Sequence, residues 1–127
     1  MASTETLKPS QLTLHATIKI DPTNTDKFLT ALRPAWAAVI NEPECLFFDV
    51  FHTPEEPGTF RFVEVWTKDW TWFLEHQMTK AYYQPYLAIT EPMWLDRELG
   101  HWERADGWSY VDKRYLAGSI RTGEGRS

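Results

Sequence analysis

The sequence predicts an α+β fold in which helices cover one face of a four-stranded antiparallel sheet. Strand-like patterns occur in four segments, and apolar residues recur at helical spacing in the stretches between them. These segments follow one another in the order β-α-β-β-α-β, which is the ferredoxin-like arrangement. A chain of 127 residues is long enough for one such domain around a single core.

The first strand and the first helix have the clearest patterns. Apolar and polar residues alternate strictly from Leu12 to Ile20, which predicts a strand with one buried face. Asp21-Pro22 ends this strand, and Thr23 or Asn24 can cap a helix that we expect to run from about Asn24 to Asn41. Pro34 lies inside this helix and removes one backbone hydrogen bond, so we expect a kink there.

Two further strands form the middle of the predicted sheet. The segment Cys45–His52 is rich in β-favouring residues, and Thr59–Trp66 has a clear two-residue period. The six residues between them, 53–58, contain two prolines and a glycine and predict a hairpin-like connection. The two strands are therefore expected to pair antiparallel. In the second of them the residues on one face are Phe60, Phe62, Glu64 and Trp66.

In the C-terminal half, the sequence patterns that predict helices and strands are less regular. A helix is expected from Asp69 to about Met78, and a shorter helical piece around Tyr82–Ile89 is expected to be interrupted by Pro85. The last strand is expected over Met93–Glu103, with a possible bulge at Gly100.

The sequence is thus divided into three parts. Residues 1–11 have no periodicity and are predicted to be a flexible N-terminus, and residues 12–104 form the folded domain. Residues 105–127 are rich in glycine yet contain several aromatic side chains, so they are predicted to form a C-terminal arm or tail.

Composition excludes several classes of protein. Thirteen basic and 18 acidic residues give a net charge of −5, which disfavours binding to nucleic acid or to an anionic membrane. No apolar run approaches the ~20 residues of a membrane span, and the start of the chain does not resemble a secretory signal. Cys45 is the single cysteine and has no partner for an internal disulfide. We therefore expect a cytoplasmic protein.

The aromatic content is unusually high. Seven Trp, five Tyr and seven Phe make up 15% of the chain, enough to fill a core, cover a subunit interface and line a pocket for a flat ligand. On the sheet face away from the helices, the alternation predicts an apolar surface, which favours pairing with a second copy of the chain in an isologous homodimer. We expect His15 to face this interface, together with Cys45, Phe47, Phe51, Val63 and Val65.

Three short motifs point to a family. The sequence Asn41-Glu-Pro-Glu-Cys-Leu-Phe-Phe-Asp-Val50, then Phe62-Val-Glu-Val-Trp66, then His76 ten residues later, resembles the antibiotic biosynthesis monooxygenase family over residues 12–104. The resemblance implies a homodimeric α+β barrel. Several members in polyketide pathways convert phenols to quinones with molecular oxygen and without metal or flavin. Two departures are that Glu44 stands where the family commonly has Gly, and that Tyr82 or Tyr83 stands where a second His is common.

Four residues are candidates for catalysis. His76 is the expected general base, since an imidazole with a pKa near 6.5 exchanges protons at neutral pH; the alternative is a half-exposed surface histidine. Glu64 lies among aromatic residues and must be protonated, hydrogen-bonded or facing a wet cavity if it is buried, although it could simply tie the helix to the strand. Tyr82 and Tyr83 are candidate hydrogen-bond donors to a substrate oxygen.

The expected substrate pocket lies between the sheet and the second helix. Its predicted lining, besides His76, consists of Leu14, Ala16, Phe48, Phe62, Trp66, Trp72 and Phe73. No metal site is expected, because His15, His52 and His101 lie on different strands without compact ligand spacing. The sequence also lacks a glycine-rich phosphate loop, so no nucleotide cofactor is predicted.

Together with the resemblance, these residues predict a cofactor-independent monooxygenase of secondary metabolism. Its substrates would be O₂ and a flat phenolic, polyketide-derived compound. Two alternatives remain open at this point. The same pocket could serve a cofactor-free cyclase, dehydratase or isomerase, or it could bind a small aromatic molecule without turnover.

Overall fold

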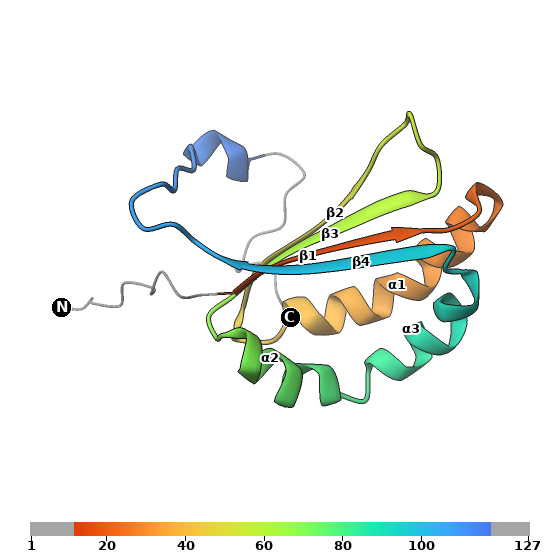
Figure 1. The fold of residues 1–127 in the computed structure, drawn as a ribbon, viewed down its shortest axis with the longest axis horizontal. Coiled ribbons are helices and arrows are strands. Elements are labelled where there is room, and N and C mark those ends of the chain that lie inside the picture. The colour runs from red at the N-terminus through yellow and green to blue at the C-terminus, as the bar shows by residue number, and fades with distance from the viewer. Residues whose placement is uncertain (1–11, 118–127) are drawn as a thin grey trace.

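The computed structural model describes residues 12–117 of the chain; the predicted flexible N-terminus, residues 1–11, and the end of the predicted arm, residues 118–127, lie outside this range. One antiparallel sheet contains four strands in the order β2-β3-β1-β4. Its α-helices cover a single face (Figure 1). The predicted ferredoxin-like α+β fold is therefore confirmed. The strands are β1 (Leu12–Lys19), β2 (Cys45–His52), β3 (Thr59–Trp66) and β4 (Asp96–Glu103).

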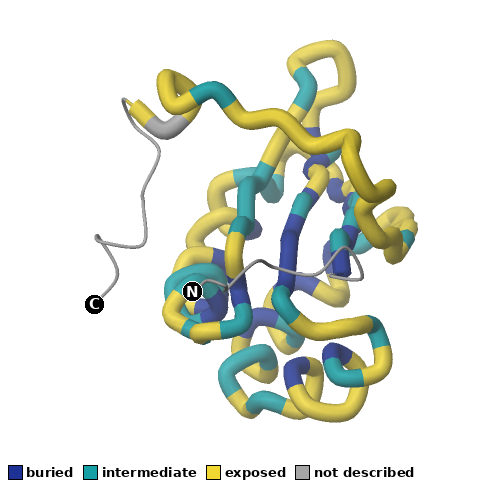
Figure 2. Tube along the Cα trace, turned by 90° about the vertical axis from the view of Figure 1, so that its left-hand side faces the viewer, coloured by how far each residue is buried: buried dark blue, intermediate teal, exposed yellow. Residues whose placement is uncertain are grey.

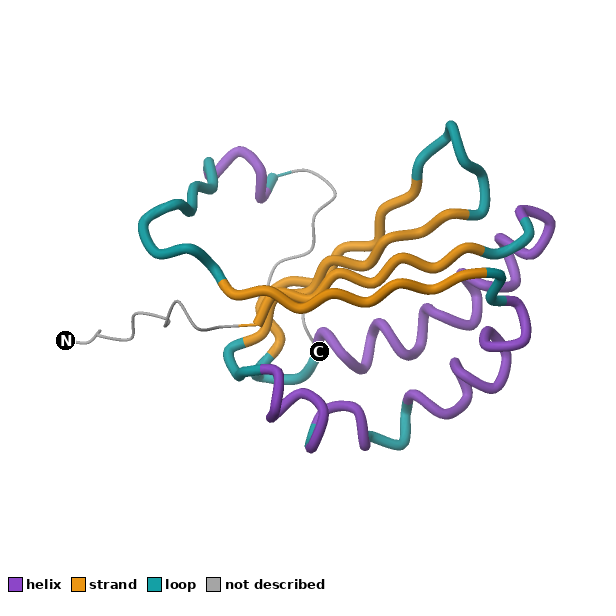
Figure 3. The backbone as a smooth tube through the Cα atoms, in the orientation of Figure 1, coloured by secondary structure: helices purple, strands orange, loops and turns teal. Residues whose placement is uncertain are grey.

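The chain has three α-helices in residues 12–117. They lie below the sheet in Figure 3. They are α1 (Thr25–Ile40), α2 (Trp70–Glu75) and α3 (Tyr83–Thr90). Short 3₁₀ turns follow α2 at Gln77–Thr79 and α3 at Glu91–Met93. The second predicted helix, residues 69–78, is thus two shorter elements. Helix α1 continues through Pro34, and the kink expected there stays a prediction.

Helix α3 differs from the sequence prediction in a way that proline chemistry explains. Pro85 was expected to interrupt the helical piece around Tyr82–Ile89, but α3 runs unbroken from Tyr83 to Thr90. Pro85 occupies the first turn, where backbone N–H groups have no partner within the helix, so the missing donor costs nothing there. β4 also begins three residues later than expected, because the 3₁₀ turn after α3 includes Met93.

A bulge in β2 corrects the prediction that Cys45 faces away from the helices. The pairing register with β3 shifts between Cys45 and Phe47, so one extra residue lies between them. As a result Cys45 is only 1% exposed and packs in the cluster that contains Val39 and Trp66. The bulge expected at Gly100 is absent from β4, since every residue of that strand pairs with β1 in register.

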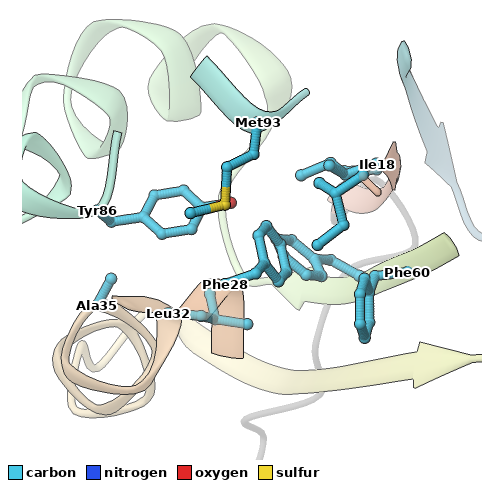
Figure 4. Packing of buried hydrophobic residues seen from close by; sticks show 10 residues of the cluster. Ile18, Phe28, Leu32, Ala35, Phe60, Tyr86 and Met93 are labelled. Atoms are coloured by element: carbon cyan, nitrogen blue, oxygen red, sulfur yellow. The ribbon is translucent and has the colours of Figure 1, made fainter. Parts of the chain in front are cut away.

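The core lies between the sheet and the helices (Figure 2). At its centre Phe28 of α1 is completely buried and stacks on Phe60 of β3, with 5.0 Å between ring centroids. Tyr86 of α3 meets the same ring edge-on at 6.3 Å (Figure 4). Each burial of a large aromatic ring removes ~150–250 Å² from water, so this stack fixes α1 and α3 against the sheet.

The opposite face of the sheet carries no α-helix among the described residues, and the short 3₁₀ turn Lys113–Leu116 lies on this side (Figure 1). The start of the C-terminal arm, residues 105–117, lies on this side (Figure 1), and the Tyr115 hydroxyl donates to Asp49 Oδ2 on β2 at 3.4 Å. Trp108 and Tyr110 of the arm are 87% and 83% exposed. In residues 12–117, no helix combines the length and hydropathy needed to cross a membrane.

Candidate functional site

A cavity of about 180 Å³ lies between the sheet and the three helices. Its walls are almost entirely apolar or aromatic, and Glu64 is the one acidic residue among them. The volume is slightly larger than that of a cavity of ~150 Å³ known to bind benzene, so one substituted aromatic ring fits inside. The sheet contributes Leu14, Ala16, Ile18, Phe48, Phe62 and Glu64, and the helices contribute Leu32, Ala35, Trp36, Val39, Trp70, Phe73, Leu74, Tyr83, Tyr86 and Leu87.

The cavity opens to solvent between α2 and the edge strand β4. Three of its lining residues are large, apolar and exposed: Leu74 at 48%, Met78 at 40% and Leu99 at 45%. Arg97 of β4 is also exposed and lines the same cavity. A larger ligand can therefore extend outward past these residues.

Five of the seven residues predicted to bind substrate line this cavity, namely Leu14, Ala16, Phe48, Phe62 and Phe73. The other two lie outside the lining. Trp66 is completely buried and packs edge-on against Phe73, with ring centroids 5.3 Å apart. Trp72 lies beyond it, at 6.1 Å from Trp66. Both tryptophans thus pack beside the cavity wall.

Glu64 brings a titratable group into this apolar space. Strand β3 directs its side chain to the helix-covered face, where it is 6% exposed. Burial raises the pKa of Glu64 to about 7, although a hydrogen bond from Trp66 Nε1 to Glu64 Oε1, 3.0 Å long, acts in the opposite direction. Burial wins because a carboxylate loses much more solvation energy than one neutral donor restores. Near neutral pH the group can both accept and return a proton.

The raised pKa of Glu64 also predicts how stability varies with pH. The folded state binds this proton more tightly than the unfolded chain, whose pKa is near 4.5. The contribution of Glu64 is therefore greatest below pH 4.5, falls as the pH rises to about 7, and is lost above it. The shift corresponds to about 3 kcal/mol of unfolding free energy.

Glu64→Gln should remove that dependence, because the amide has no titrating proton. Urea unfolding of both proteins at pH 4.5 and pH 8 measures it, and the loss of stability with rising pH should be about 3 kcal/mol larger in the wild type than in the variant. Parallel stability curves for the two proteins would contradict a raised pKa.

Tyr82 and Tyr83 meet at a buried glutamine. Gln77, which has no exposed surface, contacts both hydroxyls through Nε2, at 2.6 Å from Tyr82 and 2.9 Å from Tyr83. The Tyr82 hydroxyl donates to Glu42 Oε2 at 2.7 Å, and Lys80 Nζ pairs with the same oxygen at 3.0 Å. A chain of hydrogen bonds thus runs from the cavity to the surface.

The direction of each hydrogen bond in this chain follows from Glu42. Burial by itself raises the pKa of Glu42, but the bonds from Tyr82 and Lys80 outweigh it and lower the pKa overall, so the carboxylate accepts. Tyr82 must then donate to Glu42 and accept from the Gln77 amide group. The second N–H of the same amide donates to Tyr83, whose own proton is left to bond elsewhere.

Tyr83 keeps that proton at neutral pH. Burial raises the pKa of Tyr83 far above the usual value; the hydrogen bond from Gln77 lowers it in part, and the nearby charge of Glu64 adds a smaller increase. The residue lines the cavity, whereas Tyr82 does not. Of the two tyrosines, Tyr83 is therefore the one placed to donate to a ligand.

His76 lies away from the cavity lining. It caps the C-terminal end of α2, its side chain is exposed, and its ring centroid is 6.0 Å from that of Trp72. Its carbonyl oxygen accepts a hydrogen bond from the Thr79 hydroxyl at 2.7 Å. The catalytic role predicted for His76 remains untested, but the buried carboxylate of Glu64 is better placed to meet a ligand in the cavity.

Sequence reasoning missed three polar residues around this site. Gln77 occupies an apolar position of the helical pattern, and such a polar residue signals a buried hydrogen-bond network. Trp94 and Arg97 also line the cavity, but no sequence pattern indicated that the turn after α3 would return to it. Within residues 12–117 no cluster of His, Cys, Asp and Glu has the geometry of a metal site.

Comparisons with known proteins agree with this fold and connect it to a family. The family model for antibiotic biosynthesis monooxygenase matches residues 11–84. Among solved structures, the protein PA3566 from Pseudomonas aeruginosa superposes with a TM-score of 0.68 at 21% identity, over 79% of this chain and 98% of its own. A Caulobacter crescentus CB15 structure titled as a putative antibiotic biosynthesis monooxygenase gives a TM-score of 0.67 at 20% identity, over 77% and 92% of the two chains. At these identities the likeness shows the fold.

A sequence relative extends further along the chain. The protein named "Putative monooxygenase GME11364" from Pestalotiopsis microspora is 33% identical over 114 residues, which cover 86% of this chain and 95% of the relative. The family match spans more than half of the chain and includes strand β3, which carries Glu64, as well as Gln77 and Tyr83. On this combined evidence of sequence and fold, the chain belongs to the antibiotic biosynthesis monooxygenase family.

Proposed function

We propose that this protein is a cofactor-independent monooxygenase that oxidises a flat phenolic, polyketide-derived compound with O₂ in secondary metabolism. One observation carries the proposal: a buried carboxylate with a pKa of about 7 shares an aromatic-walled cavity with a tyrosine that has a free proton to donate. Family membership and the relative named as a monooxygenase support the class of reaction.

In the first step Glu64 acts as the general base. Its carboxylate removes the proton of the phenol, and the Tyr83 hydroxyl donates a hydrogen bond to the oxyanion that forms. A carboxylate with a pKa near the working pH suits this role, since about half of it is ionised at neutral pH and its basicity is matched to proton transfer. The apolar walls strengthen the bond from Tyr83 to the developing charge.

In the second step the substrate itself supplies the electrons. The phenolate transfers one electron to O₂, and the resulting radical and superoxide combine to form a C–O bond at a ring carbon that bears hydrogen. Loss of water from this hydroperoxide leaves a carbonyl group, so one oxygen atom enters the quinone product and the other leaves as water. No external reductant is required, because the substrate supplies both hydrogen atoms of this water. Glu64 returns to the peroxide the proton that it took from the hydroxyl, and the ring carbon loses the other.

The test is turnover of phenolic polyketide compounds by the purified protein under ¹⁸O₂. One labelled oxygen should enter each product molecule, with the second recovered in water, and no product should form under nitrogen. Product formation without oxygen would contradict the proposal and indicate a cyclase, dehydratase or isomerase that uses the same base. Recovery of a bound ligand unchanged in air would instead indicate a binding protein.

We also propose that the sheet face opposite the α-helices pairs with a second copy of the chain. This face presents Phe47, Val63 and Phe51, the last 45% exposed, and Trp102 on β4 is 64% exposed. The start of the C-terminal arm, residues 105–117, which includes the exposed Trp108 and Tyr110, runs on the same side (Figure 1). So much exposed apolar surface on one side is typical of a subunit interface.

Sedimentation velocity tests the pairing. At micromolar concentration the wild type should sediment at twice the monomer mass, and Trp102→Glu should shift it to the monomer, because an unpaired charge would be buried in the interface. Leu95→Glu is the matched control, since Leu95 is an apolar residue 73% exposed that lies outside the four strands. A monomeric wild type, or equal dissociation of both variants, would argue against this interface.

A further inference from the structure

The mouth of the cavity contains two hydrogen-bond donors, from Trp94 and Arg97, that find no side-chain or backbone acceptor in the described part of the chain. The indole N–H of Trp94 is buried, and the described residues provide no acceptor for it. The guanidinium of Arg97 lies over the ring of the same tryptophan, 5.1 Å from its centroid, and has no carboxylate partner within residues 12–117. Both residues line the cavity.

A second arginine–tryptophan pair has the same stacking but differs in its hydrogen bonding. Arg33 lies 5.0 Å from the ring centroid of Trp36, which also lines the cavity. The indole N–H of Trp36, however, donates to the carbonyl oxygen of Phe48 at 3.2 Å. Arg33 does not line this cavity. Only the pair on the β4 side therefore offers both of its donors to a ligand.

We infer that Trp94 and Arg97 form a subsite for a carboxylate, and that the substrate is therefore a hydroxyaryl carboxylic acid. A carboxylate has two acceptor oxygens and a negative charge, which match one neutral donor and one guanidinium. Burying an indole N–H without an acceptor is costly, and a carboxylate would remove that cost. This inference rests on the proposed function, because it names the substrate class of the same cavity.

The strand register places this subsite at the opposite end of the cavity from the proposed base. Arg97 pairs across from Ile18 on β1, and Glu64 pairs across from Leu14 on the same strand. Four residues along a strand span roughly 13 Å, and both side chains reach inward from their strands. The ligand should thus carry its acidic hydroxyl and its carboxylate at opposite ends of the ring system.

Ligand binding under nitrogen tests this inference without any oxygen chemistry. Titration calorimetry at pH 7 on the full chain would compare 6-hydroxy-2-naphthoate with 2-naphthol, which has the same rings and hydroxyl but no carboxylate. The carboxylate should bind roughly five- to tenfold more tightly, since a charge-assisted bond to a partly exposed guanidinium is only moderately strong. Equal affinities would overturn the inference.

Three variants locate the effect. Arg97→Gln should abolish the preference, and Trp94→Phe, which keeps an aromatic ring but removes the N–H, should reduce it to roughly twofold to threefold. Arg33→Gln is the matched control and should keep the wild-type preference, so an equal loss in this variant would show a general charge effect and overturn the subsite. Because binding needs no turnover, these outcomes are separate from the ¹⁸O₂ test of the monooxygenase reaction.

Discussion

Glu64→Gln should lower kcat/KM for the phenolic substrate by roughly 10²–10⁴-fold, the range expected for loss of a general base. The substitution keeps the size of the side chain and its acceptor oxygen for the indole of Trp66, but the amide cannot accept the substrate proton. The loss should shrink as the pH approaches the pKa of the free phenol, because solvent then produces the phenolate unaided. Steady-state oxygen uptake across pH measures both effects.

The pH profile of the wild type provides an independent check. Since the carboxylate is the active form and burial raises the pKa of Glu64 to about 7, kcat/KM should rise with pH and level off above neutrality. Tyr83 stays protonated throughout this range, so its titration should cause no fall in kcat/KM near neutral pH. A flat profile below pH 7 would contradict the assignment of Glu64.

His76→Ala is the variant that separates the two candidate bases. His76 is exposed and lies outside the cavity lining, so its loss should change kcat/KM by less than about threefold if Glu64 is the base. Unchanged circular dichroism and sedimentation must accompany either variant, because a folding defect would imitate a loss of rate. If folded His76→Ala lost about 10²-fold in kcat/KM while Glu64→Gln stayed active, His76 and not Glu64 would be the general base.

Tyr83→Phe should reduce kcat by roughly 10²–10³-fold, the usual cost of removing one donor to a developing oxyanion. KM should change much less, because the bond from this hydroxyl strengthens as the negative charge forms. The ring itself is retained, so the cavity wall keeps its shape. Single-turnover measurement of phenolate formation would place the loss in the deprotonation step.

Tyr82→Phe is the matched control for this experiment. Tyr82 contacts the same amide nitrogen of Gln77 but lies outside the cavity lining, and its hydroxyl donates to Glu42. Loss of the Tyr82 hydroxyl should lower kcat by less than about tenfold, because it only loosens Gln77, the residue that orients Tyr83. An equal or larger loss in Tyr82→Phe would show that the donor role of Tyr83 is misassigned.

Local sequence patterns determined the sheet and its topology. The strict alternation of β1 and the two-residue period of β3 fixed both strands to within one residue, because a strand with one buried face must alternate. The same period placed Glu64 on one face with Phe60, Phe62 and Trp66, and the structure shows that this face is the buried one. The patterns were weaker for α2 and α3, where short elements contain too few turns for a helical period to emerge.

Other features depended on contacts between distant parts of the chain. The bulge in β2 turns Cys45 toward the core, and nothing in the local sequence marks this shift, because it is set by how β2 pairs with β3. The exposure of His76 likewise follows from the end of α2, which terminates one residue before it.

The sequence by itself determined an α+β domain, an aromatic-rich interior and the family to which the chain belongs. Only the tertiary structure decided which polar groups meet in the cavity. Glu42, Gln77 and the adjacent Tyr82 and Tyr83 come from separate segments. Gln77 donates to both tyrosines and Tyr82 donates to Glu42, so each hydrogen bond has a direction that no spacing along the chain could specify. The pKa of Glu64 likewise depends on burial beneath three helices, a property of the packed molecule that the residue type alone does not contain.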